Sequence, residues 1–414
     1  TLRMKKIQFA LIVMLLPLIS FSQQFKAIDS TIQSEIALKN ISGGVAYIYQ
    51  NGKVVHHKAY GYSNIEDHQL MDTNSIFRIA SQTKAIVSIA FLQLVDKNKI
   101  SLDDPIEKYI PVFKYQKVAQ LEKDTMLFVE KNRSITIKDL LTHTAGISSV
   151  DEYPKFRFLF EQYKLSQSIS NGYKNLEEEV NQIAKMPLVH QPGDRYSYGF
   201  CTDVIGRLIE VVSGLPLDKY LKKNIFDPLN MEDTYFYLPE TKKSRLVKVY
   251  TKFSKDSLME IKPAVFPVNY PLDKNNQFYS AIGGLVSTTH DYSQFLICLL
   301  NKGKTSNGKQ IISEQLLDQF WTNQIGDKTF VFGGVKSLNN FGLGVGLTTN
   351  AGQVINHASE GSFFWGGAFN TAYMVDRKRN LITLFYFQRA PFVLPPLLSK
   401  LEKTTIDIVD NQKN

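Results

Sequence analysis

The sequence predicts an α+β protein in which segments from both ends of the chain build one antiparallel sheet and the middle of the chain is helical. Two pairs of β-prone runs lie near the two ends, and stretches with helical spacing of apolar residues lie between them. Neither pair is separated by a crossover helix, which favours antiparallel pairing. We therefore expect both pairs to join in a single sheet flanked by helices, with a helical insertion at roughly residues 105–270.

The first pair of runs is joined by an Asn-Gly turn. The runs are Gly44–Tyr49 and Val54–Tyr60, and the turn between them contains Asn51 and Gly52. An Asn-Gly pair suits the positive φ angles that a tight turn between antiparallel strands requires. The sequence therefore predicts a β-hairpin close to the start of the folded chain.

Helical stretches and a second hairpin follow along the chain. Apolar residues recur at helical spacing in Ala85–Val95, Asp203–Val212 and Asp291–Leu300. The first of these stretches is apolar almost all round, which indicates a helix buried on every side. Near the other end of the chain, the β-prone runs Thr371–Val375 and Leu381–Phe387 flank a polar turn. These runs predict the second hairpin.

The composition is that of an ordinary globular protein able to bury a large core. The chain has 414 residues, of which 43% are hydrophobic and 21% charged, and this excludes the disordered, collagen-like and low-complexity classes. The 48 basic and 39 acidic residues give a net charge of +9, and the positive side chains are dispersed. The densest cluster is Arg377–Arg379, and no long basic run is present. We therefore expect no nucleic-acid partner.

Residues 1–22 have the pattern of a secretory signal peptide. Lys5 and Lys6 precede the apolar run Leu11–Ile19, and small residues follow it. The apolar run is shorter than the roughly 20 residues that a bilayer-spanning helix needs, and a proline interrupts it. We therefore expect no stable membrane anchor, a periplasmic or secreted location, and a mature domain over residues 23–414.

The cysteines and histidines show no pattern typical of metal binding. Cys201 and Cys298 lie among apolar neighbours, which favours buried thiols, and a disulfide between them stays open for an exported protein. The seven histidines form no His-Glu-x-x-His pair on a helix, and His143 and His357 are expected to be structural. We expect neither a metal nor an organic cofactor.

The strongest chemical signal is Ser81 followed one helical turn later by Lys84, at the start of the buried helix. At the first turn of a helix, free backbone N–H groups and the helix dipole favour a developing negative charge. Residues three apart lie on the same helical face, so the lysine amine is within reach of the serine oxygen. Burial penalises the ammonium, and a neutral amine able to take the serine proton becomes accessible near neutral pH. The alternative is an N-cap serine beside a lysine that extends to the surface.

Two further segments combine turns with reactive or small residues. Gln191–Gly206 has the pattern of a turn that opens into a helix. Gly361–Ala368 contains the paired glycines Gly366 and Gly367, which allow another group to approach a strand backbone closely. No Gly-x-Ser-x-Gly occurs, so the sequence lacks the motif that carries the serine in Ser-His-Asp hydrolases of the nucleophile-elbow type.

These segments together resemble the group that contains serine β-lactamases, penicillin-binding proteins and family VIII esterases. The resemblance covers roughly residues 41–388 and is carried by Phe77–Lys84, Ile100–Ile106, Thr136–Gly146, Pro192–Gly193, Ile225–Met231 and Ile282–Thr289. It implies the β-lactamase/transpeptidase-like fold, in which a sheet built from both ends of the chain is joined to a helical insertion. It also implies catalysis through a covalent acyl-enzyme.

The resemblance assigns roles to the serine and its partners. Ser81 matches the nucleophile that attacks the substrate carbonyl, and Lys84 matches the residue that helps to deprotonate it. In the family, two backbone N–H groups hold the oxyanion that forms during attack. The matching positions in this chain are Ser81 and Ala368.

The second motif contains two candidate tyrosines. Tyr198 matches the family tyrosine that relays a proton to the leaving group and later activates water. A nearby lysine cation is expected to lower its pKa toward a useful range. Tyr196 is the rival for this role, but the spacing from Tyr198 to Asp203 and Gly206 is more like the esterase pattern.

Two departures from the family pattern bear on the substrate. Phe200 stands where the second motif usually carries an asparagine, so an amide contact is missing. Trp365 stands where the third motif commonly begins with Lys or His, and the resulting Trp-Gly-Gly resembles the family VIII esterases. A lysine there would pair with the carboxylate of a penicillin or a terminal D-alanine, which a tryptophan cannot do. We expect Trp365, Gly366 and Gly367 to contact substrate, although ordinary packing of Trp365 stays open.

The sequence therefore predicts an exported, carboxylesterase-like serine hydrolase that cleaves an ester or amide through an acyl-enzyme on Ser81. One alternative is a β-lactamase or D-alanyl-D-alanine carboxypeptidase that uses the same residues. Another is a non-catalytic, penicillin-binding-like ligand-binding protein, although binding alone requires neither the lysine nor the tyrosine. The expected partner is a small-molecule ester, amide or peptide. Its identity and the oligomeric state of the protein stay open.

Overall fold

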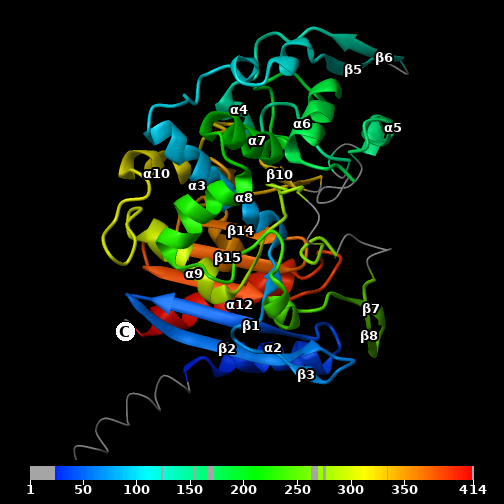
Figure 1. The fold of residues 1–414 in the computed structure, drawn as a ribbon. Helices are drawn as coiled ribbons and strands as arrows, with labels where there is room; N and C mark the ends of the chain where they lie inside the picture. The colour runs from blue at the N-terminus through cyan, green and yellow to red at the C-terminus, as the bar shows by residue number, and fades with distance from the viewer. Residues whose placement is uncertain are drawn as a thin grey trace, which may run out of the picture.

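An eight-stranded antiparallel sheet is the centre of the fold (Figure 1). The computed structural model describes residues 24–122, 125–150, 152, 154–165, 172–262, 269–273, 277–332 and 334–412. The strand order is β12-β13-β14-β15-β16-β1-β2-β3. These strands are β1 (Gly43–Gln50), β2 (Lys53–Asn64), β3 (Gln69–Leu70), β12 (Asn340–Phe341), β13 (Gly346–Leu347), β14 (Phe363–Gly367), β15 (Thr371–Asp376) and β16 (Leu381–Tyr386). Because β1 pairs with β16, the predicted single sheet from both ends of the chain is confirmed.

Both predicted hairpins are present in this sheet. The turn between β1 and β2 has φ angles of 49° at Asn51 and 85° at Gly52, the positive values that the Asn-Gly pair accommodates. The strands β15 and β16 pair in register from Thr371 with Tyr386 to Asp376 with Leu381. The predicted signal segment, residues 1–22, lies outside the described residues.

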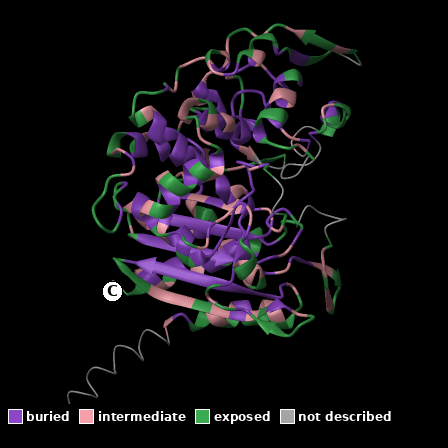
Figure 2. Cartoon of the chain, in the orientation of Figure 1, coloured by how far each residue is buried: buried purple, intermediate pink, exposed green. Residues whose placement is uncertain are grey.

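Helices cover both faces of the sheet. Alternate residues of β1 face opposite sides, so Ala46 and Ile48 pack in one apolar cluster and Val45 and Tyr47 in another. The helices α2 (Lys26–Ala37) and α12 (Pro395–Asn411) pack against each other and cover the first face, and α9 (Thr289–Leu300) covers the second. The central strands are therefore buried on both sides (Figure 2).

The rest of the chain is mainly helical and lies beyond one edge of the sheet (Figure 1). Its α-helices are α3 (Thr83–Asp96), α4 (Ile137–Leu141), α5 (Arg157–Gln162), α6 (Leu176–Lys185), α7 (Cys201–Ser213), α8 (Leu217–Leu221) and α10 (Glu314–Phe320). The short helix α11 (Gln353–Asn356) packs instead against α12. Short 3₁₀ turns include η1 (Ala80–Gln82). The three helices that the sequence predicts correspond to α3, α7 and α9. The insertion boundaries at residues 105–270 stay a prediction.

Short strand pairs interrupt the helical part, and the sequence did not predict them. They are β4 (Phe77–Arg78) with β9 (Val286–Ser287), β5 (Val118–Glu122) with β6 (Thr125–Val129), β7 (Tyr250–Ser254) with β8 (Ser257–Glu260), and β10 (Val331–Phe332) with β11 (Val335–Lys336).

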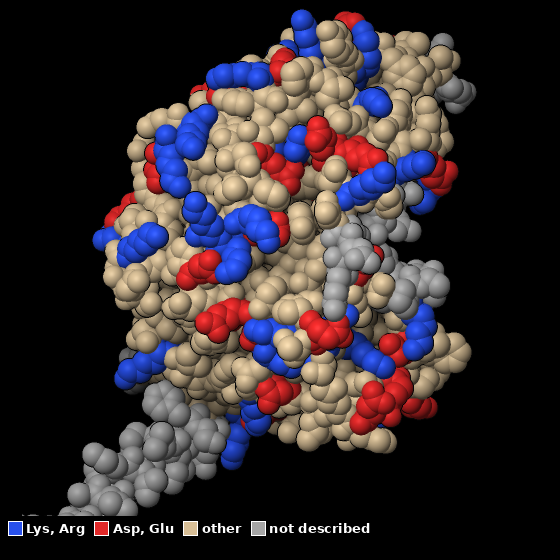
Figure 3. Space-filling model, viewed as in Figure 1, with Lys and Arg blue, Asp and Glu red and all other residues tan. Residues whose placement is uncertain are grey.

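Among the described helices, none combines the length and apolar character required to span a bilayer. On the face drawn in Figure 3, Lys and Arg are interspersed with Asp and Glu, as expected for solvated surface charge.

The end of β14 approaches the turn before α3 very closely at Gly367. A Cβ atom at this position would lie 2.4 Å from the carbonyl oxygen of Ile79 and 2.5 Å from the hydroxyl oxygen of Thr371. Only glycine permits this approach, because Cβ atoms do not pack against backbone at such distances. The contact fixes the strand against the segment that carries Ser81.

We predict that Gly367→Ala destabilises the protein by about 1–3 kcal/mol, because the methyl group must push apart two packed backbone segments. Gly366→Ala is the matched comparison, since its Cβ would lie 3.3 Å from its nearest neighbour, the carbonyl oxygen of Thr371. The measurement is the free energy of unfolding in denaturant for both variants. An equal or smaller loss for Gly367→Ala would contradict the close approach.

Candidate active site

Ser81 lies in η1, the short turn that leads directly into α3. The preceding residue, Ala80, has a φ of 43°, in the left-handed region that costs a residue with a Cβ roughly 1–2 kcal/mol. Such backbone strain persists only where the surroundings hold it. Here the side chain of Gln82 accepts a hydrogen bond from the Tyr386 hydroxyl at 2.7 Å, which ties the turn to the sheet. The serine is therefore held at the entrance of a buried helix.

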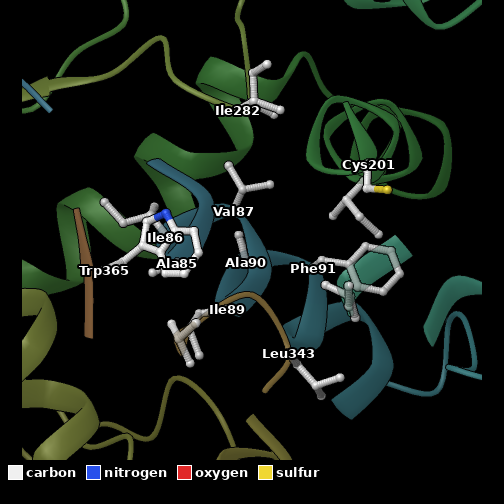
Figure 4. Close-up of a cluster of buried hydrophobic side chains, with 14 of the residues drawn as sticks. Ala85, Ile86, Val87, Ile89, Ala90, Phe91, Cys201, Ile282, Leu343 and Trp365 are labelled. Atoms are coloured by element: carbon white, nitrogen blue, oxygen red, sulfur yellow. The ribbon is translucent and has the colours of Figure 1, made fainter. Parts of the chain in front are cut away.

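Lys84 is buried because α3 is apolar on every side. Figure 4 shows α3 side chains surrounded by Cys201, Ile282, Leu343 and Trp365. Lys84 itself is 2% exposed. Its Nζ lies 3.2 Å from Ser81 Oγ and donates a hydrogen bond to the carbonyl oxygen of Ile282 at 2.7 Å. The lysine is therefore directed at the serine by a backbone acceptor.

Desolvation lowers the pKa of Lys84 to about 7, against the smaller opposing effects of Asp203 and Cys201. The ammonium loses its hydration in this environment, whereas the neutral amine loses little. A substantial fraction of the amine is therefore unprotonated at neutral pH. This is the protonation state that can accept the proton of the Ser81 hydroxyl.

Tyr198 also contacts the serine. Its hydroxyl donates a hydrogen bond to Ser81 Oγ at 2.8 Å, and Lys84 Nζ lies 4.6 Å from the centre of its ring. Burial raises the pKa of Tyr198 above its usual value, although hydrogen bonds with Ser81 and Trp365 oppose the rise. The expectation that the lysine lowers this pKa is therefore wrong, because desolvation of the phenolate is the largest effect on it and raises it. The phenol is neutral at neutral pH.

Backbone contacts explain why the Tyr198 ring reaches the serine. The Ser148 hydroxyl donates a hydrogen bond to the Tyr198 carbonyl at 3.1 Å, and the N–H of Ser197 donates to the carbonyl of His143 at 2.7 Å. At the next residue, Gly199, a Cβ would lie 2.2 Å from the backbone of Ser148. The segment before α7 is therefore clamped against the loop that follows α4.

Tyr196 points into a different environment. Its hydroxyl is buried and has no hydrogen-bond partner among the described residues. Its ring contacts Phe330 at 5.1 Å and Phe341 at 5.1 Å, measured between ring centres. The structure therefore brings Tyr198, and not Tyr196, to Ser81.

Trp365 forms part of an aromatic wall beside these groups. The wall is Trp365, Tyr198, Phe330 and Phe341, with ring centres 5.7 Å, 6.0 Å and 5.4 Å from the Trp365 ring. Trp365 is 6% exposed. The indole is therefore packed into the core, and it borders the tyrosine at the same time.

The backbone of the third motif closely approaches the turn that carries Ser81. Ala368 directly follows Gly367, the residue that packs against Ile79. Within the described residues, the N–H groups of Ser81 and Ala368 donate no hydrogen bond to the protein. Two backbone donors are thus left for another acceptor, as a stabilised oxyanion requires. Their role in catalysis stays a prediction.

Several neighbours of the site carried no chemical signal in the sequence. The ring of His143 lies 4.9 Å from that of Tyr198, and burial holds the pKa of this histidine well below its usual value. The carbonyl of Ile282 accepts a hydrogen bond from Lys84 through the backbone, which no residue type in the sequence reveals.

Cys201 and Cys298 are both buried and free, so the structure contains two thiols and no disulfide between them. In the described part of the chain, no group of three or more side chains is arranged to hold a metal ion.

Known proteins match most of this chain. A model of the family described as Beta-lactamase matches residues 28–397. Protein Rv1367c of Mycobacterium tuberculosis strain H37Rv is 30% identical over 368 residues, which cover 85% of this chain and 86% of that protein. The lovastatin esterase of Penicillium rubens is 26% identical over 395 residues, which cover 91% of this chain and 96% of the esterase.

A solved structure has the same fold over nearly the whole length. EstCE1, described as a hydrolase with promiscuous acyltransferase activity, aligns with a TM-score of 0.77 at 21% identity. The alignment covers 93% of this chain and 100% of that protein. The fold is therefore the β-lactamase/transpeptidase-like fold that the sequence predicted. Together with the match of the family model over residues 28–397, this leads to one conclusion: the chain belongs to the β-lactamase family of serine hydrolases and related proteins.

Proposed function

We propose that this protein is an exported serine hydrolase that cleaves a small-molecule ester through a covalent acyl-enzyme on Ser81. The observation that carries the proposal is the convergence of two proton-carrying groups on one oxygen. Lys84 Nζ lies 3.2 Å and the Tyr198 hydroxyl 2.8 Å from Ser81 Oγ. Export rests on the signal peptide predicted in residues 1–22.

Acylation begins with attack of Ser81 Oγ on the ester carbonyl carbon. The serine proton passes to the neutral Nζ of Lys84, and the carbonyl oxygen becomes an oxyanion that the N–H groups of Ser81 and Ala368 stabilise. The bond to the leaving alkoxide then breaks. The alkoxide takes the phenol proton of Tyr198, and the Lys84 ammonium returns a proton to the tyrosine. An alcohol leaves, and the acyl group stays on Ser81.

Deacylation repeats these steps with water. The same pair of groups takes a proton from a water molecule as its oxygen attacks the acyl carbonyl carbon. The bond to Ser81 Oγ breaks, and the serine oxygen recovers a proton from the tyrosine and lysine pair. A carboxylic acid leaves. Every proton is carried by Ser81, Lys84 or Tyr198, so the cycle uses no cofactor.

The aromatic wall supports an ester rather than a β-lactam as the substrate. Trp365 occupies the position at which a cation would pair with a substrate carboxylate, and its neighbours Phe330 and Phe341 are also uncharged. An apolar acyl or alcohol group gains more from such a wall than an anionic one does. The similarity to an esterase from Penicillium rubens is consistent with this substrate class. The natural acyl group and alcohol are not identified by these contacts.

The test compares short-chain p-nitrophenyl esters with a chromogenic cephalosporin, using the mature protein and its Ser81→Ala variant. We expect ester turnover that disappears in the variant, with little cephalosporin turnover. Dominant cephalosporin turnover would favour the β-lactamase or D-alanyl peptidase alternative on the same residues. If Ser81→Ala retains both activities, Ser81 is not the nucleophile. An intact protein that binds these compounds without turnover would favour the ligand-binding alternative.

We predict that Tyr198→Phe lowers kcat for ester hydrolysis by about a hundredfold or more, because it removes the group that protonates the leaving alkoxide. Tyr196→Phe is the matched control. The Tyr196 hydroxyl has no hydrogen-bond partner among the described residues, so its removal should leave kcat within about twofold. Steady-state kinetics on one ester of an alkyl alcohol, followed by titration of the released acid, measures both, because an alkoxide needs a proton to leave. Similar losses in the two variants would contradict the assignment of Tyr198.

We predict that kcat/KM for ester hydrolysis falls as the pH is lowered through about 7, because the Lys84 amine then takes up the proton that makes it inactive as a base. Activity is retained above this pH, where the amine is neutral. Lys84→Arg should be inactive at every pH, because a guanidinium does not deprotonate in proteins. A midpoint close to the ordinary lysine value, or appreciable activity of Lys84→Arg, would rule out the neutral amine as the base.

A further inference from the structure

Two carboxyl groups are buried behind the catalytic lysine. Asp203 on α7 and Glu179 on α6 are both 0% exposed. The proposed reaction uses neither residue. A buried carboxyl group is costly unless its charge is paired or hydrogen-bonded. These two therefore require an explanation.

Asp203 is connected to Lys84 through one short backbone segment. Its Oδ1 accepts hydrogen bonds from the N–H of Ala281 at 2.6 Å and the N–H of Ile282 at 3.1 Å. The carbonyl of Ile282 in turn accepts the hydrogen bond from Lys84 Nζ at 2.7 Å. The carboxylate thus anchors the residue that orients the lysine.

A close approach of α7 to this segment makes the connection possible. At Gly206, one turn after Asp203, a Cβ would lie 2.7 Å from the Cβ of Ala281. The missing side chain lets α7 come near enough for the carboxylate to reach two backbone N–H groups. Glycine inside a helix costs about 1 kcal/mol relative to alanine, so this approach has a structural benefit that offsets the cost.

Of the titratable groups that face Lys84, Asp203 has the largest charge effect on it. Burial raises the pKa of Tyr198 and of the Cys201 thiol, so both are neutral at neutral pH. Burial also keeps His143 neutral by lowering its pKa. Asp203 is therefore the group whose negative charge most favours the ammonium form of Lys84.

Glu179 faces Asp203 from α6. Burial raises the pKa of Asp203, and the opposing effects come from the N–H of Ile282, from Lys84, from the N–H of Ala281 and from a hydrogen bond with Glu179. Two carboxyl groups can hydrogen-bond only when one of them carries a proton. Glu179 therefore lies close enough to Asp203 to influence its protonation.

We propose that Asp203 is a positioning residue that orients Lys84 through the Ala281–Ile282 segment and sets its protonation state. This inference rests on the proposed function, in which Lys84 is the base that activates Ser81. The charge of Asp203 favours the ammonium form, and the desolvation of Lys84 favours the amine. The balance between them places the working range of the enzyme at neutral pH.

The test measures the rate at which a fluorophosphonate probe labels Ser81, as a function of pH, in the full mature protein. Asp203→Asn keeps an oxygen acceptor for both backbone N–H groups and removes the charge. We expect its midpoint for labelling to shift to lower pH by about one unit, because the ammonium loses its buried partner. Asp291→Asn is the matched control. Asp291 is also buried and accepts hydrogen bonds from the N–H of Asp233 and the Thr234 hydroxyl, so its midpoint should stay at the wild-type value.

The outcomes separate this inference from the proposed function. If the wild-type protein is labelled at Ser81 and the pH midpoint for labelling is the same in Asp203→Asn, the inference about Asp203 is overturned. The assignment of Ser81 as the nucleophile is then retained. If Ser81 of the wild-type protein is not labelled at any pH, both are overturned. Should Asp203→Asn not fold, Gly206→Ala is the second variant, since its Cβ would lie 2.7 Å from the Ala281 Cβ and would push α7, with the Asp203 carboxylate, away from this segment. The midpoint then moves to lower pH, and an unmoved midpoint contradicts the inference.

Discussion

The burial of one lysine in a helix that is apolar on every side is the constraint on which the site depends. An exposed lysine is an ammonium at neutral pH and cannot accept a proton from serine. The sequence of α3 removes water from Lys84, and the fold supplies the polar contacts that make such burial tolerable: the carbonyl of Ile282, the oxygen of Ser81 and the ring of Tyr198. The cost of desolvation thereby makes the Lys84 amine basic near neutral pH.

The architecture places each contributor on a separate, firmly packed element. Ser81 and Lys84 come from the start of α3, and Tyr198 comes from the segment that precedes α7. The third motif comes from β14, whose glycine packs on the carbonyl of Ile79. The site therefore lies where the sheet meets the helical part of the chain. Sites built on rigid elements in this way keep the reacting groups in place without a large rearrangement.

Local patterns in the sequence were sufficient for much of the fold and part of the site. The Asn-Gly turn and the period-2 runs identified the hairpins, and the run Ala85–Val95 identified the buried helix with Ser81 and Lys84 at its start. These features are encoded within a few neighbouring residues. The small strand pairs β5–β6 and β7–β8 were missed, because short, half-exposed strands lack a strong hydrophobic pattern.

The remaining features depend on contacts between distant segments. Tyr196 and Tyr198 both fit the motif, and only the tertiary contact with Ser81 separates them. The pKa of Tyr198 was predicted in the wrong direction, because its burial is set by residues far away in the sequence. The bond from Ile282 to Asp203 joins residues 79 positions apart and uses backbone groups that every residue carries. Such a contact cannot be predicted from the residue types in the sequence.

The central claim is that Lys84 activates Ser81 to form a covalent acyl-enzyme. The most direct measurement is to mix the mature protein with p-nitrophenyl acetate, quench it with acid within the first turnovers, and locate any acetyl group by peptide mass spectrometry. The account predicts acetyl on the peptide that contains Ser81 in the wild-type protein, and none on that peptide in Lys84→Met. Ester turnover without acetyl on Ser81, or unchanged acetylation in Lys84→Met, would contradict it.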